Sequence, residues 1–325
     1  MRHLAPDLYL EADFMLAAWG NALITTRTTF PDVKFLAGSV DTEGYIEGLG
    51  SQARFKEITS LVQLNRTHIV ISDRRNSCLR MLDRVTGQTS PYAGQCGVRG
   101  FADGPALDVI FDFPSDVMFD ERDRQNLIIL DDYNDAIRLL DMSTMSLKTL
   151  YANDVELTRP RYGVIDAYNS DVMYITIKRR IVKYSFSKNA VTHLTGSLPT
   201  PEEKRIVSDG HYTVARYGYF ISGIAQINQQ FLVVTDFWSD KVRVIDLHNE
   251  QVYSLCEDSV VQVLSVSPVD ERHVCKTIKP HAVTVVNNTL YIGENGRILI
   301  KSSKLYSSAV IYHLSLAHTS RVSIV

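Results

Sequence analysis

The feature that most constrains how this chain can fold is an internal repeat with a period of about 56 residues. Small and aromatic residues of the first copy recur 56 positions later: Ala37, Gly38, Gly44, Gly48 and Phe55 return as Ala93, Gly94, Gly100, Gly104 and Phe111. Residues 72–80 are likewise echoed by residues 130–138 and by residues 235–243. The aspartates of these three segments are Asp73, Asp131 and Asp236, and they lie 58 and then 105 positions apart. Because the second gap is about two periods long, a divergent copy of the repeat is expected between Asp131 and Asp236. Strand-rich repeats of this length predict the blades of a β-propeller.

Each repeat unit is expected to hold four short antiparallel strands separated by turn residues. In the first unit the strand-like segments are residues 61–64, 68–72, 79–83 and 89–93. Four antiparallel strands are the content of one propeller blade. We therefore predict an all-β fold in which residues 1–325 form a single six-bladed β-propeller domain. Five of its blades are expected over residues 36–95, 96–153, 154–198, 206–258 and 272–316.

The sixth blade is expected to be composite. The N-terminal segment offers three strands, over residues 15–18, 22–26 and 33–36, which is one strand short of a blade. The C-terminal segment Arg321–Val325 is apolar enough to supply the missing strand. A sixth blade made from residues 8–35 and 320–325 would close the ring and remove the open sheet edges of an unclosed one.

The repeat resembles that of the NHL family of β-propellers. Its blades carry an Ala-Gly pair, a glycine-rich Asp-Gly turn, an aromatic residue before the inner strand and then Asp-x-x-Asn-x-x-Ile-Arg. Asp131, Asn134, Ile137 and Arg138 match the last motif in full. The resemblance covers roughly residues 33–314 and is weaker in the third and fifth units, which lack the aspartate. It implies the fold far more firmly than it implies a function.

Composition excludes several classes of function. The chain of 325 residues carries 34 Lys+Arg and 37 Asp+Glu, a formal net charge of −3, so it has no overall basic footprint and no nucleic-acid partner is expected. No apolar run approaches the roughly 18 residues of a membrane helix, so no membrane insertion is expected. The acidic N-terminal segment does not resemble a signal peptide, and we expect the sequence to be a piece of a longer exported protein.

Four cysteines form two close pairs. Antiparallel pairing of the third and fourth strands of the first unit gives partner numbers that sum to about 172 to 174, which brings Cys96 beside Cys78. Cys256 and Cys275 would close a loop between the fourth and fifth units. Paired cysteines favour a disulfide-bonded, secreted or cell-surface extracellular protein, although four unrelated buried thiols would also fit.

Two glycosylation sequons agree with export. They begin at Asn65 and Asn287, and each lies in the expected turn between the first and second strands of its unit. In a propeller such turns share one face. Glycans there would leave the opposite face free for a partner.

The sequence offers one candidate ligand for a central metal site, His281. Pro280-His281-Ala282-Val283 is similar to the motif of propeller enzymes such as the peptidyl-amidoglycolate lyases, in which histidines from several inner strands hold a metal. The equivalent positions in the other units are expected to be Thr59, Ser115, Tyr162 and Ser222. One histidine does not make a site, so no metal, no cofactor and no catalytic residue are predicted. An exported metal-dependent lyase or hydrolase with a tunnel site near His281 remains the alternative.

Other acidic residues are expected to be structural. The cluster of Asp112, Asp116, Asp120, Glu121 and Asp123 lacks the alternating ligand loop of a calcium site and is interpreted as a solvated face. The repeated aspartates would each fix a turn by hydrogen bonding, because they recur at one place in every blade.

The predicted function is non-catalytic recognition of a protein or glycan partner. Between the repeated Asp and Asn-like positions the units carry different residue pairs on one face, and Phe237 and Trp238 are unusual for a solvent-facing turn. The predicted partner-binding residues are Arg74, Arg75, Tyr133, Phe237 and Trp238. A less favoured alternative is an intracellular NHL propeller that binds single-stranded RNA through arginines and aromatic residues of this face.

Overall fold

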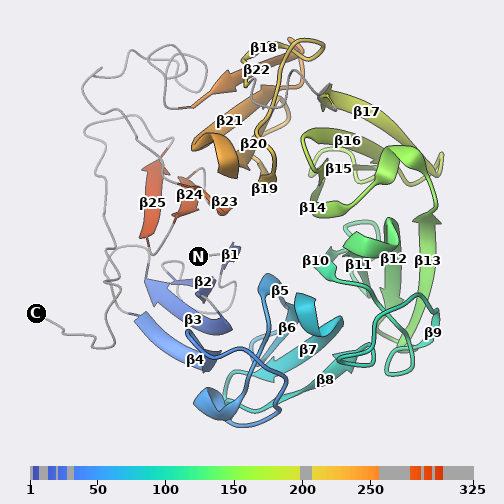
Figure 1. Cartoon of the computed structure of the whole chain (residues 1–325), viewed down its shortest axis with the longest axis vertical. Helices are drawn as coiled ribbons and strands as arrows, with labels where there is room; N and C mark the ends of the chain where they lie inside the picture. The colour runs from blue at the N-terminus through green and yellow to red at the C-terminus, as the bar shows by residue number, and fades with distance from the viewer. Residues whose placement is uncertain are drawn as a thin grey trace, which may run out of the picture.

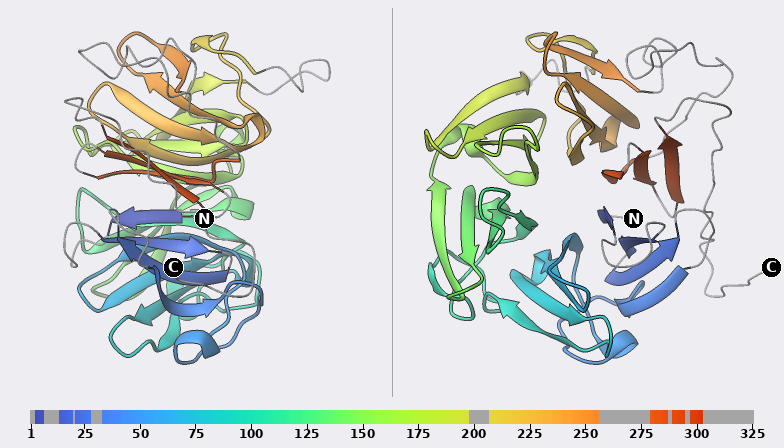
Figure 2. Two further views of the ribbon diagram at one scale, coloured as in Figure 1. Left: turned by 90° about the vertical axis from the view of Figure 1, so that its left-hand side faces the viewer. Right: turned by 180° about the vertical axis from the view of Figure 1, so that it is seen from behind.

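The computed structural model describes residues 3–6, 14–19, 21–27, 33–197, 207–255, 279–286, 289–294 and 297–302. The described strands form six antiparallel sheets. These sheets are arranged around a common axis, as Figure 1 shows along the axis and Figure 2 shows from the side and from behind. The described helical elements are three-residue 3-10 turns only. The prediction of an all-β propeller is therefore confirmed.

Four sheets lie between the two terminal sheets in the sequence, and we call them blades 1 to 4; the four main strands of each follow one another in the chain. Blade 1 contains β5 (Ile58–Gln63), β6 (His68–Asp73), β7 (Cys78–Asp83) and β8 (Thr89–Ala93). Blade 2 contains β10 (Pro114–Phe119), β11 (Asn126–Asp131), β12 (Ala136–Asp141) and β13 (Ser146–Ala152), with β9 (Gly104–Pro105) on its outer edge. Blade 3 contains β14 (Pro160–Ile165), β15 (Val172–Ile177), β16 (Arg180–Ser185) and β17 (Ala190–Gly196). Blade 4 contains β19 (Ile221–Gln226), β20 (Phe231–Asp236), β21 (Lys241–Asp246) and β22 (Gln251–Ser254), with β18 (Gly210–His211) outside it.

The other two sheets correct our prediction of how the ring is built. The N-terminal sheet takes four strands from one end of the chain, namely β1 (His3–Pro6), β2 (Phe14–Trp19), β3 (Asn21–Arg27) and β4 (Val33–Ser39). We expected three strands there, because residues 3–6 are too short to show an alternating pattern. The last sheet has three described strands, β23 (Ala282–Val286), β24 (Thr289–Glu294) and β25 (Arg297–Ser302). A closed ring of six four-stranded blades is thus not shown, and residues 320–325, the predicted closing strand, lie outside the described residues.

The hydrophobic core lies between adjacent sheets. Between blades 1 and 2, for example, Val70 and Leu79 pack in one cluster with Val117 and Leu127. The second strands β15 and β20 are buried along their whole length. Their β-branched and aliphatic residues face a neighbouring blade on both sides, which explains why these strands are apolar at nearly every position.

The glycines of the repeat are required by the backbone. Gly38, Gly94 and Gly196 lie at the end of the fourth strand of their sheets with φ of 93°, 91° and 89°, a conformation that favours glycine. A Cβ at Gly38 would lie 2.3 Å from the backbone oxygen of Asn21. The structure therefore adds Gly196 to the repeat, which the sequence pattern alone did not include.

The repeated aspartates fix the turn after the second strand, as predicted. Asp73 accepts hydrogen bonds from the Lys56 amide (2.7 Å) and the Asn76 side chain (2.9 Å), and it pairs with the buried guanidinium of Arg80 (3.0 Å). Asp131 and Asp236 pair in the same way with Arg138 and Arg243. These hydrogen bonds and ion pairs hold the turn after the second strand in blades 1, 2 and 4.

Candidate partner-binding face

The predicted binding residues lie in three short turns between second and third strands. These turns are η2 (Arg74–Asn76), η3 (Asp132–Asn134) and η5 (Phe237–Ser239). The remaining described turns are η1 (Gly50–Gln52) and η4 (Val155–Leu157), in the connections between blades. Because successive blades repeat one strand order, η2, η3 and η5 lie on one face of the propeller, which we call the η face.

The first residue of each η turn points to the next blade. Arg74 of η2 forms an ion pair with Asp132 of η3 (2.6 Å), and Asp132 in turn binds Arg159 at the start of β14 (2.5 Å). The Phe237 ring of η5 lies 4.4 Å, between ring centres, from that of His281 before β23. Two of the five predicted residues, Arg74 and Phe237, therefore join blades to one another.

The second residue of each η turn is displayed to solvent. The side chain of Arg75 is 52% exposed, Tyr133 is 42% exposed and Trp238 is 58% exposed. The third residue is structural in η2 and η3, where Asn76 and Asn134 bind the repeated aspartates. The turn thus separates residues that build the ring from residues that a partner can contact.

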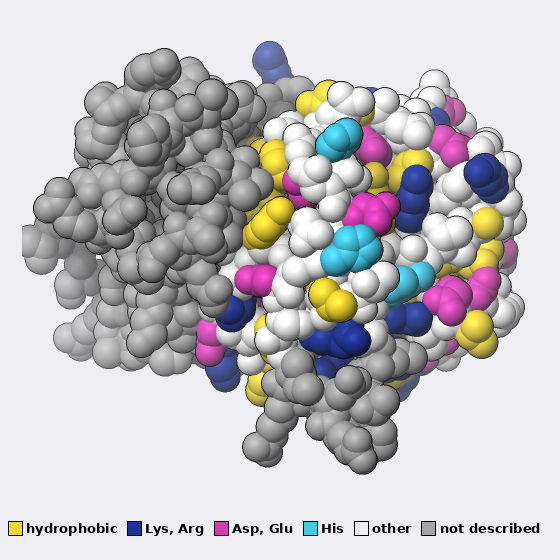
Figure 3. Space-filling view, turned by 90° about the horizontal axis from the view of Figure 1, so that it is seen from above, with side chains coloured by type: hydrophobic (Ala, Val, Ile, Leu, Met, Phe, Trp, Pro, Cys, Tyr) yellow, Lys and Arg dark blue, Asp and Glu magenta, His cyan; other side chains and the backbone are white. Residues whose placement is uncertain are grey.

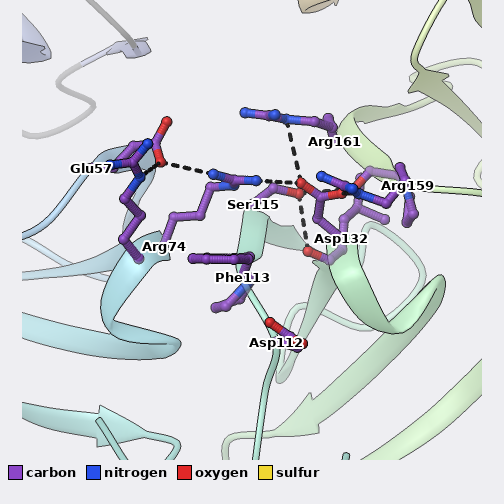
Figure 4. A network of polar contacts seen from close by, with 12 residues as sticks. Glu57, Arg74, Asp112, Phe113, Ser115, Asp132, Arg159 and Arg161 are labelled. Atoms are coloured by element: carbon purple, nitrogen blue, oxygen red, sulfur yellow. Dashed lines mark hydrogen bonds and ion pairs between the residues drawn. The ribbon is translucent and has the colours of Figure 1, made fainter. Parts of the chain in front are cut away.

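A network of ions crosses from blade 1 to blade 3 at the centre of the η face (Figure 4). Arg74 donates through Nη1 to Glu57 (2.8 Å) and through Nη2 to Asp132. Asp132 is fully buried, and its second oxygen accepts from Nε of Arg159. The Nε of Arg161 lies 3.6 Å from the same carboxylate without a hydrogen bond. The cluster leaves more guanidinium donors than the carboxylates can satisfy.

Tyr133 is held between cationic and aromatic neighbours. The Arg159 guanidinium carbon lies 3.4 Å from the centre of the tyrosine ring, and the Phe113 ring meets that ring edge-on at 4.6 Å between centres. Arg99 lies 5.4 Å from the ring centre and is fixed by Asp112 (2.7 Å). The Arg159 guanidinium therefore covers one face of the Tyr133 ring, while the residue as a whole is 42% exposed.

A second, aromatic patch surrounds η5. Trp238 meets Phe237 and Tyr219 edge-on, with ring centres 5.4 and 6.4 Å away, and Tyr219 is 69% exposed. The Nζ of Lys279 lies 5.5 Å from the centres of both the Phe237 and the Trp238 ring. Exposed aromatic residues beside a cation are typical of protein interfaces.

The structure adds residues to the η face that the sequence did not single out. These residues, which come from three separate segments of the chain and reach the same two patches, are Arg99, Arg159, Arg161 and Lys279. A signal was present for two of them, because Arg159 and Arg161 flank Pro160, which aligns with Pro114 of blade 2.

The strand register corrects one alignment. Each inner strand of blades 1 to 4 has a bulge, and the extra residues are Thr59, Ser115, Arg161 and Ser222. The position equivalent to His281 in blade 3 is therefore Arg161 and not Tyr162, which we misplaced by one residue because blade 3 lacks the repeated aspartate. Among the described residues no three His, Cys, Asp or Glu side chains are placed to hold a metal ion.

The acidic cluster is dispersed, and our interpretation of it as a solvated face was only partly right. Asp112, Asp120 and Glu121 pair with Arg99, Arg122 and Arg124. Asp120 is nevertheless only 2% exposed, and Asp116, on the innermost strand of blade 2, is 6% exposed.

Asp116 joins three inner strands. It accepts hydrogen bonds from the Ser60 hydroxyl of β5 (2.6 Å), from its neighbour's amide at Val117 (3.0 Å) and from the Gly163 amide of β14 (2.9 Å). No cation pairs with it among the described residues. Burial raises the pKa of this carboxyl from its ordinary 3.8 to about 7, and the three hydrogen bonds oppose that rise without cancelling it.

This shift predicts a pH dependence of stability. The folded state binds a proton at Asp116 that the unfolded chain has already released, so this group stabilises the fold below about pH 4 and loses that contribution as the pH rises to about 7. We expect the free energy of unfolding of the wild type, minus that of Asp116→Asn, to fall by at least about 1 kcal/mol between pH 5 and pH 8. Urea unfolding of both proteins at the two pH values measures the difference. An unchanged difference would show that the carboxyl is ionised throughout.

The structure contains the predicted disulfide between Cys78 and Cys96, with Cα atoms 5.0 Å apart. It joins the first residue of β7 to the connection between blades 1 and 2, where the Gly97 amide also binds the Asn76 carbonyl (2.7 Å). Asn65 is exposed in the β5–β6 turn, on the side opposite to the η face. Cys256, Cys275 and Asn287 lie outside the described residues.

The described residues that are coloured in Figure 3, which shows the molecule from above, form no comparable patch. Along the edge that carries β18 and β22, basic and acidic side chains are interspersed among neutral ones, and the hydrophobic side chains are scattered. Scattered apolar residues on a surface are ordinary. The described part of the chain also contains no helix with the length and apolar character of a membrane span.

Comparison with solved structures supports the fold. A chain of a nidogen/laminin complex matches with a TM-score of 0.58 and 12% sequence identity, covering 92% of both chains. An auxiliary nutrient binding protein from Bacteroides thetaiotaomicron matches with a TM-score of 0.62 and 10% identity over 90% of this chain and 66% of that one. Virginiamycin B lyase from Staphylococcus aureus matches with a TM-score of 0.54 and 10% identity over 98% and 85% of the two chains.

These similarities define a class of protein by fold. The sequence itself matches no protein-family model, and no curated protein matches it. At 10 to 12% identity the structural neighbours, which include binding proteins and a lyase by name, show the β-propeller fold alone. The NHL resemblance remains a prediction from the repeat.

Proposed function

We propose that this chain is a non-catalytic, extracellular binding module that recognises a protein or glycan partner through the η face. The observation that carries the proposal is the display of Arg75, Tyr133 and Trp238 at the same position of three blades. Each is at least 42% exposed on a turn whose other residues are anchored. Rigid presentation of arginine and aromatic side chains is how protein surfaces provide binding hot spots at low entropic cost.

The extracellular part of the proposal rests on the covalent chemistry of the chain. The Cys78–Cys96 disulfide would persist in an oxidising compartment. The exposed sequon at Asn65 would place a glycan on the face opposite to the η face, where it would not block a partner. We further propose that the whole chain is one NHL-type domain with six blades, closed through its two ends.

The test uses a double variant of displayed residues. Tyr133→Ala with Trp238→Ala should lose binding to any partner found on arrays of extracellular proteins and glycans, with at least about a tenfold rise in Kd. Both side chains are exposed, so thermal unfolding should change little. The midpoint temperature is measured alongside binding.

A matched pair on the opposite face serves as the control. Val85 and Tyr168 are 74% and 59% exposed in the β7–β8 and β14–β15 turns. Val85→Ala with Tyr168→Ala should bind as the wild type does. If the control pair loses binding and the η-face pair retains it, the partner uses the other face and the proposal is wrong.

A further inference from the structure

Arg161 differs from the residues at its equivalent positions. Thr59, Ser115 and Ser222 are the bulged residues of the other complete blades, and all three are small and buried. The hydroxyls of Ser115 and Ser222 donate to backbone oxygens of Pro160 and Pro280 in the next sheet, at 2.9 and 2.7 Å. Blade 3 places a long cation where the other three blades place a small hydroxyl side chain, which in blades 2 and 4 binds the backbone of the next sheet. A bulge changes the direction in which a side chain leaves the strand.

The guanidinium of Arg161 is fixed in place but has unused donors. It stacks on the ring of Phe220 at 4.3 Å, and its Nε, which is buried, lies too far from Asp132 to donate a hydrogen bond. The described residues provide no hydrogen-bond acceptor for any of its nitrogens. The side chain is 16% exposed, so an external group can reach it. In Figure 4 it extends from blade 3 above Asp132 toward Arg74.

The acidic residues around Arg161 are already engaged. One oxygen of Asp132 binds Arg74 and the other binds Arg159, while Glu57 binds both Arg74 and Arg75. Arg161 is therefore the third guanidinium on one carboxylate. A second carboxylate placed against it would gain charge-assisted hydrogen bonds and would meet a surplus of positive charge.

We infer that Arg161 binds the carboxylate of an acidic side chain that a protein partner inserts at the centre of the η face. The inference rests on the proposed function and names the chemistry of its partner. A protein side chain fits better than an acidic sugar, because the aromatic rings beside Arg161 offer no open face for stacking. One face of Phe220 is covered by Arg161 itself, and Tyr162, the other ring near the Arg161 guanidinium, is only 8% exposed.

The experiment follows the Nε–H signals of arginines by NMR of ¹⁵N-labelled protein. The probes are a capped pentapeptide with a central aspartate between glycines, the same peptide with asparagine, sodium acetate and glucuronate. The signal of Arg161 is assigned by its absence in Arg161→Gln. We expect the aspartate peptide to shift this signal and to bind at least tenfold more tightly than the asparagine peptide, and Arg161→Gln to abolish the difference.

Two further variants make the result specific. Arg124→Gln removes an exposed arginine of the β10–β11 turn, paired with Glu121, and should leave peptide binding unchanged. Arg161→Lys retains the charge without the planar fork and should bind with intermediate affinity. Circular dichroism verifies that each variant is folded. If Arg161→Gln does not fold, the affinity of Arg161→Lys and the comparison of the four probes on the wild type test the site instead.

Each contrary outcome has a defined meaning. If acetate binds as tightly as the aspartate peptide, the ligand is a small carboxylate, and the inference that it is a protein side chain is wrong. If glucuronate binds more tightly than the aspartate peptide, the partner is an acidic glycan and not a protein. No shift of the Arg161 signal with any probe would overturn the site itself. If Arg161→Gln binds normally while Tyr133→Ala with Trp238→Ala does not, the proposed function stands and this inference fails.

Discussion

Replacing Arg74 by methionine is expected to lower the free energy of unfolding by about 3 kcal/mol. The side chain is buried between two carboxylates, with Glu57 at 2.8 Å and Asp132 at 2.6 Å. Methionine fills a similar volume but leaves both carboxylates with one charge partner fewer in a site sheltered from water. Because these contacts join blade 1 to blade 2, the loss should appear in the global unfolding transition. Urea denaturation of both proteins measures the difference in the free energy of unfolding, and the dependence of that free energy on urea concentration is compared between the two proteins.

The neighbouring residue supplies the control. Arg75 belongs to the same turn and binds the same Glu57 oxygen (2.9 Å), but its side chain is 52% exposed. Arg75→Met should therefore cost less than about 1 kcal/mol, as exposed ion pairs do. Equal losses in the two variants would mean that burial does not govern the strength of these pairs. No loss in either would mean that the network contributes nothing to the junction of the blades.

Removing the disulfide is expected to have a comparable effect. The bridge joins residues 18 positions apart, and closing a loop of this length in the unfolded chain stabilises the fold by about 3 kcal/mol. Cys78→Ala with Cys96→Ala should lose about this much, measured by urea unfolding without reductant. The η2 turn should remain folded, because the Asn76 carbonyl still binds the Gly97 amide.

The same comparison in the presence of a reductant tests the cause. Once the wild-type bridge is reduced, both proteins lack the constraint, so their free energies of unfolding should converge. A difference of about 3 kcal/mol that persists under reducing conditions would show that the alanine substitutions act by loss of packing and not by loss of the bridge.

The repeat predicted the fold because its spacing reflects backbone requirements. Gly38 and Gly94 recur since both lie at positive φ, and Asp73 and Asp131 recur since each closes the same turn. The strand pattern failed where these residues are missing. Blade 3 has no repeated aspartate, and Arg161 was consequently placed one residue out of register.

The sequence also predicted that variable residues on one face form the candidate site, but it could not assign their roles. Arg74 and Arg75 are adjacent and chemically identical, yet one is buried between blades and the other is exposed. Which of them faces inward depends on the bend of the η2 turn and on Asp132, which is supplied by another blade 58 residues away.

Local sequence by itself therefore determined the propeller fold, the repeated turns and the pairing of Cys78 with Cys96, because these depend on short-range strand pairing and backbone conformation. Only the tertiary structure decided that β1 completes the N-terminal sheet and that Asp116 is buried. It alone also decided that Arg161 reaches the centre of the η face. These features arise where separate blades meet, and the electrostatic environment of a side chain there is set by residues that are distant in the sequence.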